Sequence, residues 1–358
     1  MTKPLLYKGR GVASNHTGRY EAQTTELVDD GWGGLDADLP PLLTETWVDN
    51  TRTVLNYNQS PDLPFDRSLN PYRGCEHGCV YCFARPTHAY LGLSPGLDFE
   101  SKLLYKPDAA QLLKAELSRR NYRCAPIAIG TNTDAYQPIE REHKIMRQVL
   151  AVLLETRHPV TIVTKSSLIE RDIDLLSELA QLQLVTVGIS LASLDGKLAR
   201  LLEPRAATPK RRLAVIKQLH NANIPVHVLA APMIPGLNDH ELENVITTAS
   251  ESGAQSAEYI LLRLPLEVAS LFEEWLRLHY PLKAEHVMQL IRDMRLGKTY
   301  DATFFQRMVG SGVYAELLSQ RFKLITKRQG LNQGLPNLRC DLFKPPHPAG
   351  QMSFDFFT

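Results

Sequence analysis

Residues 126–165 read PIAIGTNTDAYQPIEREHKIMRQVLAVLLETRHPVTIVTK, and this stretch decides the fold. Two short runs rich in apolar and β-branched residues, 126–130 and 160–165, enclose a segment whose apolar residues recur at helical spacing. A short run that is apolar on both faces is typical of a strand buried in a parallel sheet, whose crossover helix buries one face only. The stretch therefore predicts a strand, a helix and a second, parallel strand.

The same pattern recurs on both sides of this stretch. A first strand is predicted near 68–74, and further strands are predicted at 184–190, 225–231 and 257–263. Right-handed crossovers curl six such βα units into a barrel that six strands leave incomplete. The predicted fold class is therefore α/β, a partial (β/α)6 barrel over residues 67–290.

The segments that flank the barrel carry opposite charges. The 358 residues include 40 Lys+Arg and 39 Asp+Glu, so the formal net charge is only +1. An irregular N-terminal extension, predicted over 1–66, contains eight acids and one base between residues 29 and 66. A helical C-terminal extension, predicted over 291–358, contains nine bases and three acids between residues 295 and 344. The overall balance excludes a uniformly basic nucleic-acid coat but leaves a local basic site open.

The basic C-terminal extension has two interpretations. Tyr300, Phe304, Phe305 and Tyr314 alternate with its bases, a pattern that suits base stacking and phosphate contacts on DNA or RNA. Alternatively, a helix over about 302–322 packs on the barrel and turns its basic face to solvent or to the acidic N-terminal extension. The packed face would then consist of Phe305, Met308, Val309 and Leu317.

The sequence also predicts a compartment. No apolar run approaches the roughly 18 to 20 residues that cross a bilayer, and residues 1–20 lack the apolar core of a signal peptide. Five cysteines are too few for a disulfide framework. We therefore expect a cytoplasmic protein without a membrane partner.

Three of the five cysteines lie close together in the loop after the first predicted strand. Residues 70–90 read NPYRGCEHGCVYCFARPTHAY, which places Cys75, Cys79 and Cys82 within eight residues. Soft thiolates at this density bind zinc or an iron–sulfur cluster. Structural zinc needs a fourth ligand, for which His77 or His88 is available nearby. A cluster held by three thiolates instead leaves one iron open, and an open iron is a catalytic site.

Polar residues also follow the later strands, and chemistry in βα barrels lies at the carboxyl ends of the strands. These residues are Thr131, Thr133, Asp134, Lys165 and Ser190. Three of them also have an ordinary structural interpretation. Asp134 or Ser190 would cap a helix, and Lys165 would be a surface lysine.

The cysteine spacing C-x3-C-x2-C, with Tyr81 directly before the last cysteine, resembles the radical S-adenosylmethionine (SAM) superfamily. In that family three cysteines hold a 4Fe-4S cluster, and reductive cleavage of SAM gives a deoxyadenosyl radical that takes hydrogen from the substrate. The resemblance implies that Cys75, Cys79 and Cys82 are the cluster ligands and that Tyr81 flanks the cluster or the adenosine. It also implies SAM and an electron donor such as flavodoxin or ferredoxin as partners.

Four further segments, at 130–140, 161–167, 187–213 and 231–239, resemble the branch of the superfamily that contains spore photoproduct lyase. The resemblance implies that Lys165 and Ser190 bind the SAM carboxylate. It further implies that the SAM amino group is bound at the end of the second strand by Thr131, Thr133 and Asp134.

Two more residues of these segments have open assignments. Glu203 and Arg205 form either a clamp near SAM or a surface ion pair. The loop at 232–236 either packs its backbone against adenine or is a plain turn.

The sequence departs from the lyase pattern at the hydrogen donor. Phe83 stands where that lyase has a tyrosine, and the loop 130–140 contains no cysteine. Cys124 precedes the second strand, so barrel geometry places it on the opposite face. Cys340 and Tyr136 are the remaining candidate hydrogen donors, each with a packing role as the alternative. Thymine-dimer repair by the same chemistry is therefore not expected.

The leading functional prediction is a radical SAM enzyme for which nucleic acid is one candidate substrate. A zinc-stabilised, non-catalytic nucleic-acid-binding module is the second interpretation. Radical modification of a small molecule or a protein is the third.

Overall fold

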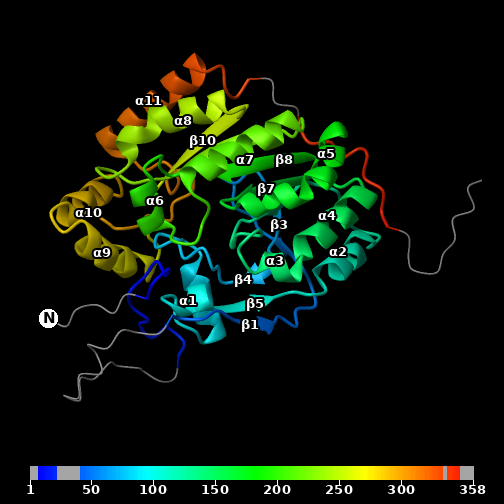
Figure 1. Cartoon of the computed structure of the whole chain (residues 1–358), viewed down its shortest axis with the longest axis horizontal. Coiled ribbons are helices and arrows are strands. Elements are labelled where there is room, and N and C mark those ends of the chain that lie inside the picture. The colour runs from blue at the N-terminus through cyan, green and yellow to red at the C-terminus, as the bar shows by residue number, and fades with distance from the viewer. Residues whose placement is uncertain (1–6, 22–40, 334–336, 347–358) are drawn as a thin grey trace, which may run out of the picture.

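Six parallel strands form the centre of the computed structural model, which describes residues 7–21, 41–333 and 337–346. Their order in the sheet follows their order in the chain (Figure 1). The strands are β3 (Arg67–Leu69), β6 (Ile127–Ile129), β7 (Val160–Thr164), β8 (Val185–Ser190), β9 (Val226–Met233) and β10 (Ser256–Leu261). A short antiparallel strand, β2 (Leu55–Tyr57), pairs with β3. Among the described strands β10 and β2 form two separate edges, so the predicted partial barrel is confirmed and it does not close.

Helices cover the outer face of this sheet, as the apolar stripes predict. They are α2 (Ala109–Leu117), α4 (Ile145–Glu155), α5 (Ile173–Gln181), α7 (Pro209–Asn221) and α8 (Leu242–Glu251). In α7, Thr208 accepts a hydrogen bond from the amide of Arg211, and Pro209 begins the helix where no intrahelical N–H is needed. Because a helix covers the outer face between successive strands, the strands run parallel and their carboxyl ends lie at the same edge of the sheet.

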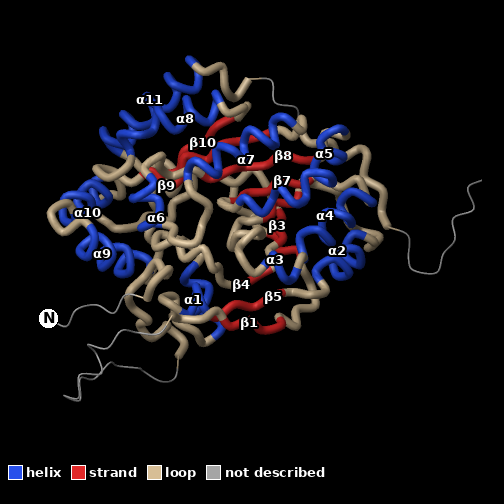
Figure 2. Tube along the Cα trace, viewed as in Figure 1, coloured by secondary structure: helices blue, strands red, loops and turns tan. Residues whose placement is uncertain are grey.

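A second, three-stranded sheet was not predicted. It consists of β1 (Glu45–Val48), β5 (Lys102–Tyr105) and β4 (Tyr72–Arg73), and it lies at the lower edge of the view in Figure 2. The predicted first strand, 68–74, is in fact two strands in different sheets, because Pro71 has no N–H and interrupts the ladder between β3 and β4. The N-terminal extension thus contributes two short strands, β1 and β2, whose few residues give no readable alternation.

The C-terminal extension contains α11 (Gly312–Arg328), which begins ten residues later than expected. Gly310 and Gly312 have positive φ angles of 73° and 83°, and this backbone ends the helical pattern before α11. Its buried face consists of Ala315, Leu318 and Ile325 instead of the expected residues. Phe305 and Leu317, which were predicted to pack on the barrel, are exposed.

Acids of the same chain pair with two arginines of this extension. Arg307 forms an ion pair of 2.6 Å with Asp62 in the N-terminal extension, and Arg321 forms one of 2.6 Å with Glu243 on α8. These contacts favour the packed interpretation of the C-terminal extension. The acidic residues 29–38 lie outside the described residues.

The remaining helices include α9 (Val268–His279) and α10 (Ala284–Asp293), which lie at one end of the molecule (Figure 1). Across the described ranges, every helix is too short or too polar to cross a membrane.

His158, just before β7, makes stability depend on pH. The ring is fully buried, with Nδ1 2.9 Å from the carbonyl oxygen of Pro159 and Nε2 2.7 Å from the hydroxyl of Tyr122. Burial lowers the pKa of His158 to about 4, although the Pro159 carbonyl acts in the opposite direction. The unfolded chain, with a pKa of about 6.5, therefore takes up the proton first as the pH falls, and stability is lost from pH 6.5 downwards.

We expect this residue alone to lower the free energy of unfolding by about 2 kcal/mol between pH 6.5 and pH 5. Urea denaturation of the wild type and of His158→Gln at both pH values measures the effect. The variant should lose about 2 kcal/mol less than the wild type over this interval. Equal losses in the two proteins would contradict the assignment.

Candidate active site

The cysteine loop begins directly after β4. Cys75 and Cys79 are buried and Cys82 is half-buried. The amide of Cys75 donates to the carbonyl oxygen of Phe99 at 2.9 Å, and the amide of Cys82 donates to that of Cys79 at 3.2 Å. All three thiols are free and none is in a disulfide. The loop is therefore an ordered turn that presents three unpaired thiols.

Two glycines are required by the shape of this loop. Gly74 and Gly78 have φ angles of 76° and 66°, which L side chains rarely adopt. A Cβ atom at Gly78 would lie 2.7 Å from a carboxylate oxygen of Glu100, and one at Gly74 would lie 2.6 Å from Leu103. No larger residue fits at either position without moving its neighbours.

The thiols of the loop lie close enough to one another to affect each other's pKa. Burial, with nearby Glu203 and Cys82, raises the pKa of Cys79 to about 12. Burial also raises the pKa of Cys75, with contributions from Asp134, Cys79 and Cys82. A bound metal would have to compensate for this cost of thiolate formation.

The arrangement differs from a site for one metal ion. Within the described ranges no three His, Cys, Asp or Glu side chains come together as a single ion requires. A zinc ion holds all its ligands about 2.0 to 2.3 Å from one centre, whereas a cluster distributes its thiolates over different irons.

A fully buried ion pair supports the loop. Arg85, in the 3-10 helix η1 (Arg85–Leu91), pairs with Glu100 of α1 (Asp98–Ser101). Its Nε donates to the carbonyl oxygen of Cys79 at 2.9 Å. The other oxygen of Glu100 accepts from the amide of Gly11 at 2.8 Å. Arg85 thereby fixes the backbone between the second and third cysteines.

A second buried chain of contacts begins at Tyr81. Its hydroxyl donates to Glu203, which follows α6 (Gly196–Leu202), and Glu203 pairs in turn with Arg212 of α7. Arg212 also donates from Nη1 to the carbonyl oxygen of Ser190 at 2.9 Å. The chain connects Tyr81 of the cysteine loop to the end of β8, where Ser190 was predicted to act.

Lys165, directly after β7, lies close to the cysteine loop and to Glu203. Burial alone would lower the pKa of Lys165, but Cys79, Glu203 and Asp134 raise it above its usual value. Within the described ranges its Nζ makes no hydrogen bond or ion pair, unlike a surface lysine in an ion pair. Lys165 is thus a charged ammonium group beside the cysteine loop with free donors.

Asp134 is already engaged by the protein. It accepts hydrogen bonds from the hydroxyl of Thr164 and the amide of Lys165, each at 2.7 Å, and from the amide of Tyr136 at 2.9 Å. Nδ1 of His77 lies 3.3 Å from a carboxylate oxygen of Asp134. The carboxylate therefore joins the loop after β6 to the end of β7, and it does not cap the next helix, α3 (Glu140–His143).

The other polar candidates are also hydrogen-bonded. The hydroxyl of Ser190 donates to the carbonyl oxygen of Ala231 at 3.2 Å. Thr133 is buried and its hydroxyl donates to the carbonyl oxygen of Tyr72 at 3.3 Å. Thr131 accepts from Asn70 at 3.3 Å and is half-buried. Of the three, Thr131 lies at the cavity described below.

The predicted pairing of Glu203 with Arg205 is wrong. Arg205 pairs with Glu76 of the cysteine loop at 2.9 Å, whereas Glu203 pairs with Arg212. The reason is that Glu203 ends α6, and Arg212 returns to it from the first turn of α7. Arg205 therefore contacts the cysteine loop from outside.

The structure places both candidate hydrogen donors outside the residues that line the cavity described below. Tyr136 is fully buried in the core, and its hydroxyl donates to Asp172 at 3.2 Å. Cys340 lies beside Cys124, and the amide of its neighbour Arg339 donates to the carbonyl oxygen of Gln183 just before β8. Cys340 is therefore at the amino ends of the parallel strands, on the face opposite the cysteine loop.

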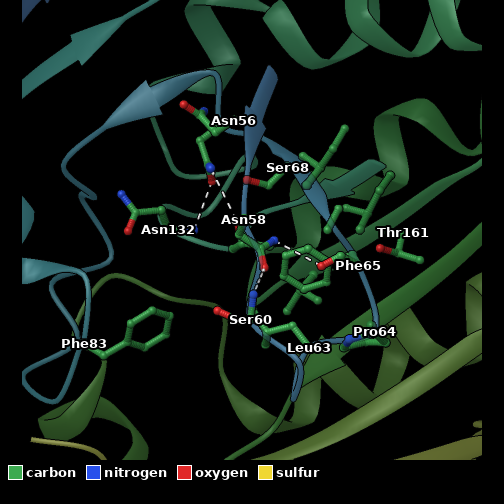
Figure 3. Close-up of a pocket in the computed structure, with 18 of the residues that line it drawn as sticks. Asn56, Asn58, Ser60, Leu63, Pro64, Phe65, Ser68, Phe83, Asn132 and Thr161 are labelled. Atoms are coloured by element: carbon green, nitrogen blue, oxygen red, sulfur yellow. Dashed lines mark hydrogen bonds between the residues drawn. The ribbon is translucent and has the colours of Figure 1, made fainter. Parts of the chain in front are cut away.

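A cavity of about 810 Å³ occupies the interior of the partial barrel. Its wall includes Val163, Gly188, Leu229 and Ile260, which are inward-facing residues of β7 to β10. Residues 58–65 of the N-terminal extension enter it, and Asn58 donates to the carbonyl oxygen of Phe65 at 3.1 Å. Figure 3 shows Phe83 entering the same space from a separate segment.

Phe83 directly follows Cys82, so the cavity adjoins the cysteine loop. The residues that line it in the described part of the chain include no cysteine. A substrate in this space would therefore lie next to the cysteine loop, with no thiol on the wall.

Residues 69–249, just over half of the chain, match the family model described as the Radical SAM superfamily. The chain belongs to the radical SAM superfamily. It is therefore an enzyme of a family that uses a 4Fe-4S cluster and SAM. The three free thiols in one ordered loop suit the cluster, and the ammonium of Lys165 beside them suits the negative charge of thiolates and of a carboxylate.

Curated relatives of this radical SAM protein are uncharacterised. One from Mycobacterium tuberculosis (strain ATCC 25618 / H37Rv) is 38% identical over 232 residues, which is 64% of this chain and 68% of the relative. One from Methanocaldococcus jannaschii is 27% identical over 213 residues, which is 60% of this chain and 76% of the relative.

Solved structures of spore photoproduct lyase have a similar fold. A variant with bound AdoMet and dinucleoside spore photoproduct has a TM-score of 0.58 at 14% identity, covering 79% of this chain and 78% of that one. The lyase complexed with dinucleoside spore photoproduct has a TM-score of 0.56 at 13% identity and the same coverage. At this identity the radical SAM protein shares the fold of the lyase, and the likeness says nothing of its substrate.

Arg212 and the pair Arg85–Glu100 were not predicted from the sequence. A signal for Arg212 was present, because it lies on the same helical face as Val215, Ile216 and Leu219, and a charged residue on an apolar stripe needs a buried partner. No comparable signal existed for Arg85, since neither η1 nor α1 has a readable period.

Proposed function

We propose that this radical SAM enzyme holds its cluster through Cys75, Cys79 and Cys82. The observation that carries the proposal is the single ordered loop with three free, mutually close thiols at the carboxyl ends of the strands. When bound, the cluster supplies an electron to SAM, and SAM cleavage gives a deoxyadenosyl radical that takes hydrogen from the substrate.

The ammonium of Lys165 binds the SAM carboxylate in this proposal. Its free donors and the nearby negative charges keep it protonated at neutral pH, and a carboxylate would provide the missing partner. Ser190 contributes indirectly, because its carbonyl oxygen holds Arg212 and its hydroxyl is bound to Ala231. Tyr81, fixed by Glu203, flanks the cluster or the adenosine.

The SAM amino group is bound at the end of β6 in this proposal. Thr131 has a half-buried hydroxyl at the cavity, and it is the best placed of the predicted residues there. Thr133 and Asp134 support the loop instead of binding SAM, because their side chains already bond to Tyr72 and to the start of the next loop. Arg205 holds Glu76 and stabilises the cysteine loop.

The reaction differs from spore photoproduct repair in its hydrogen donor. The cavity wall carries no cysteine among the described residues, and Tyr136 and Cys340 lie elsewhere. The hydrogen that completes the reaction would come from SAM-derived deoxyadenosine or from a group outside the cavity wall. Flavodoxin or ferredoxin is the class of electron donor that we propose, and nucleic acid remains one candidate substrate.

We expect the anaerobically purified protein to be brown and to bind about four iron atoms per chain. With dithionite and SAM it should release 5′-deoxyadenosine and methionine. Iron and sulfide analysis and liquid chromatography of the products provide the measurement. Omission of dithionite is the control, since the electron must come from the reductant.

Stoichiometric zinc in a colourless protein would refute the proposal. Iron binding without any deoxyadenosine would refute the SAM assignment while leaving the cluster ligands standing.

A further inference from the structure

Arg263, two residues after β10, lies on the cavity wall and makes no ion pair with the described residues. Its guanidinium carbon is 4.7 Å from the ring centroid of Phe83 and 5.9 Å from that of Tyr300. Nη2 donates to the hydroxyl of Tyr300 at 3.3 Å, and Nη1 contacts the sulfur of Met308 at 3.5 Å. Nε is buried and has no hydrogen-bond partner among the described residues. The group is thus held between two rings with donor capacity unused.

A second guanidinium reinforces the positive charge. Arg295 is 2% exposed, and it donates to the carbonyl oxygens of Gln306 at 2.9 Å and Leu262 at 3.1 Å. Among the described residues it has no ion pair. Burial lowers the pKa of Arg295, and the neighbouring charge of Arg263 lowers it further. Arg263 and Arg295 are two neighbouring guanidiniums in a poorly solvated place, and neither contacts a carboxylate among the described residues. Their burial raises the free energy of the folded protein unless an anion binds between them.

Two other arginines of the cavity are paired with carboxylates. Arg307 pairs with Asp62 at 2.6 Å, and Arg73 pairs with Asp49 at 2.7 Å. Lys106 donates to the carbonyl oxygen of Asn70 at 2.7 Å. Among the arginines that line the cavity in the described part of the chain, Arg263 is therefore the one without an ion pair, and it lies next to Phe83 and the cysteine loop.

We propose that Arg263, reinforced by Arg295, binds an anionic group of the substrate, a phosphate or a carboxylate, inside the barrel cavity. The proposal rests on the proposed function, because it takes this cavity to be the substrate site of a radical SAM enzyme. The planar guanidinium can give two parallel hydrogen bonds to either oxyanion, and the rings of Phe83 and Tyr300 limit its orientations. The bound anion fixes the rest of the substrate beside the cysteine loop.

The test uses the full-length protein with its cluster and saturating SAM. Inorganic phosphate and acetate are titrated separately at low ionic strength by calorimetry. Saturating SAM occupies its own carboxylate site, so the titration reports a different one. We expect at least one anion to bind, and Arg263→Gln should weaken that binding by about tenfold or more, since it removes a charged hydrogen-bond donor. The anion affinity of Arg263→Lys should lie between those of the wild type and Arg263→Gln, because lysine keeps the positive charge but cannot give two parallel hydrogen bonds.

Arg200→Gln is the matched control, since Arg200 is exposed on α6 and is not among the residues that line the cavity. It should bind the anion as the wild type does. Tight phosphate and weak acetate binding would identify a phosphate-bearing substrate, and the reverse order would identify a carboxylate. The proposal is overturned if neither anion binds, if Arg263→Gln binds as well as the wild type, or if the anion displaces SAM. Release of deoxyadenosine by the wild type, assayed in the same preparation, tests the proposed function separately.

Discussion

Cys79→Ala is expected to abolish the release of deoxyadenosine from SAM and to remove most of the bound iron. Cys79 is the central cysteine of the loop, and its thiol lies near both Lys165 and Cys82. With one thiolate missing, only two of the proposed ligands remain to hold the cluster. The measurement is iron per chain together with deoxyadenosine per hour in the presence of dithionite.

Cys124→Ala is the matched control for this variant. Cys124 precedes β6 at the amino ends of the strands and lies beside Cys340, far from the proposed ligands. It should keep the iron content and the SAM cleavage of the wild type. Undiminished turnover in Cys79→Ala would disprove the ligand assignment. Equal losses in both variants would indicate general unfolding.

Arg85→Met is expected to lower the free energy of unfolding by about 3 to 5 kcal/mol. Arg85 and Glu100 are both fully buried, so the substitution leaves the carboxylate of Glu100 buried without its cation. The substitution also removes the donor to the carbonyl oxygen of Cys79. Urea denaturation of the full chain measures the change, and iron analysis should show weaker cluster retention.

Lys114→Met provides the comparison for Arg85→Met. Lys114 pairs with Glu155 at 2.7 Å, but both side chains are exposed. Exposed pairs contribute about 0 to 1 kcal/mol, so this variant should unfold almost as the wild type does. A loss for Arg85→Met no greater than that for Lys114→Met would show that the buried pair does not stabilise the loop.

The strand pattern could be predicted because buried parallel strands and their covering helices require apolar residues at regular spacings in the sequence. The residues of β6 to β10 lie within a residue or two of the expected positions. The second sheet could not be predicted, because β1, β4 and β5 are two to four residues long and pair with distant segments. The course of α11 was misjudged, because Gly310 and Gly312 act through backbone conformation and not through hydrophobic spacing.

The candidate site also has a part that the sequence predicts and a part that it does not. The cysteine loop was predictable, because its chemistry depends on spacing within one short segment. The partners of Glu203 and Arg205 were not, because the choice between Arg212 and Glu76 depends on how α6 and α7 turn relative to the loop. Tyr136 and Cys340 could be evaluated only in three dimensions, because the direction of a side chain from its strand decides whether it reaches the cavity.

The described sheet does not close between β10 and β2, so one side of the cavity is formed by segments outside the sheet. Residues 58–65 and Met308 line the cavity between β10 and β2, and the pair Asp62–Arg307 joins the two extensions there. The thiols and Lys165 are carried by the sheet and its loops, whereas this side wall is carried by the two ends of the chain. Substitutions in the side wall can therefore change which molecules the cavity accepts without changing the cysteine loop or Lys165.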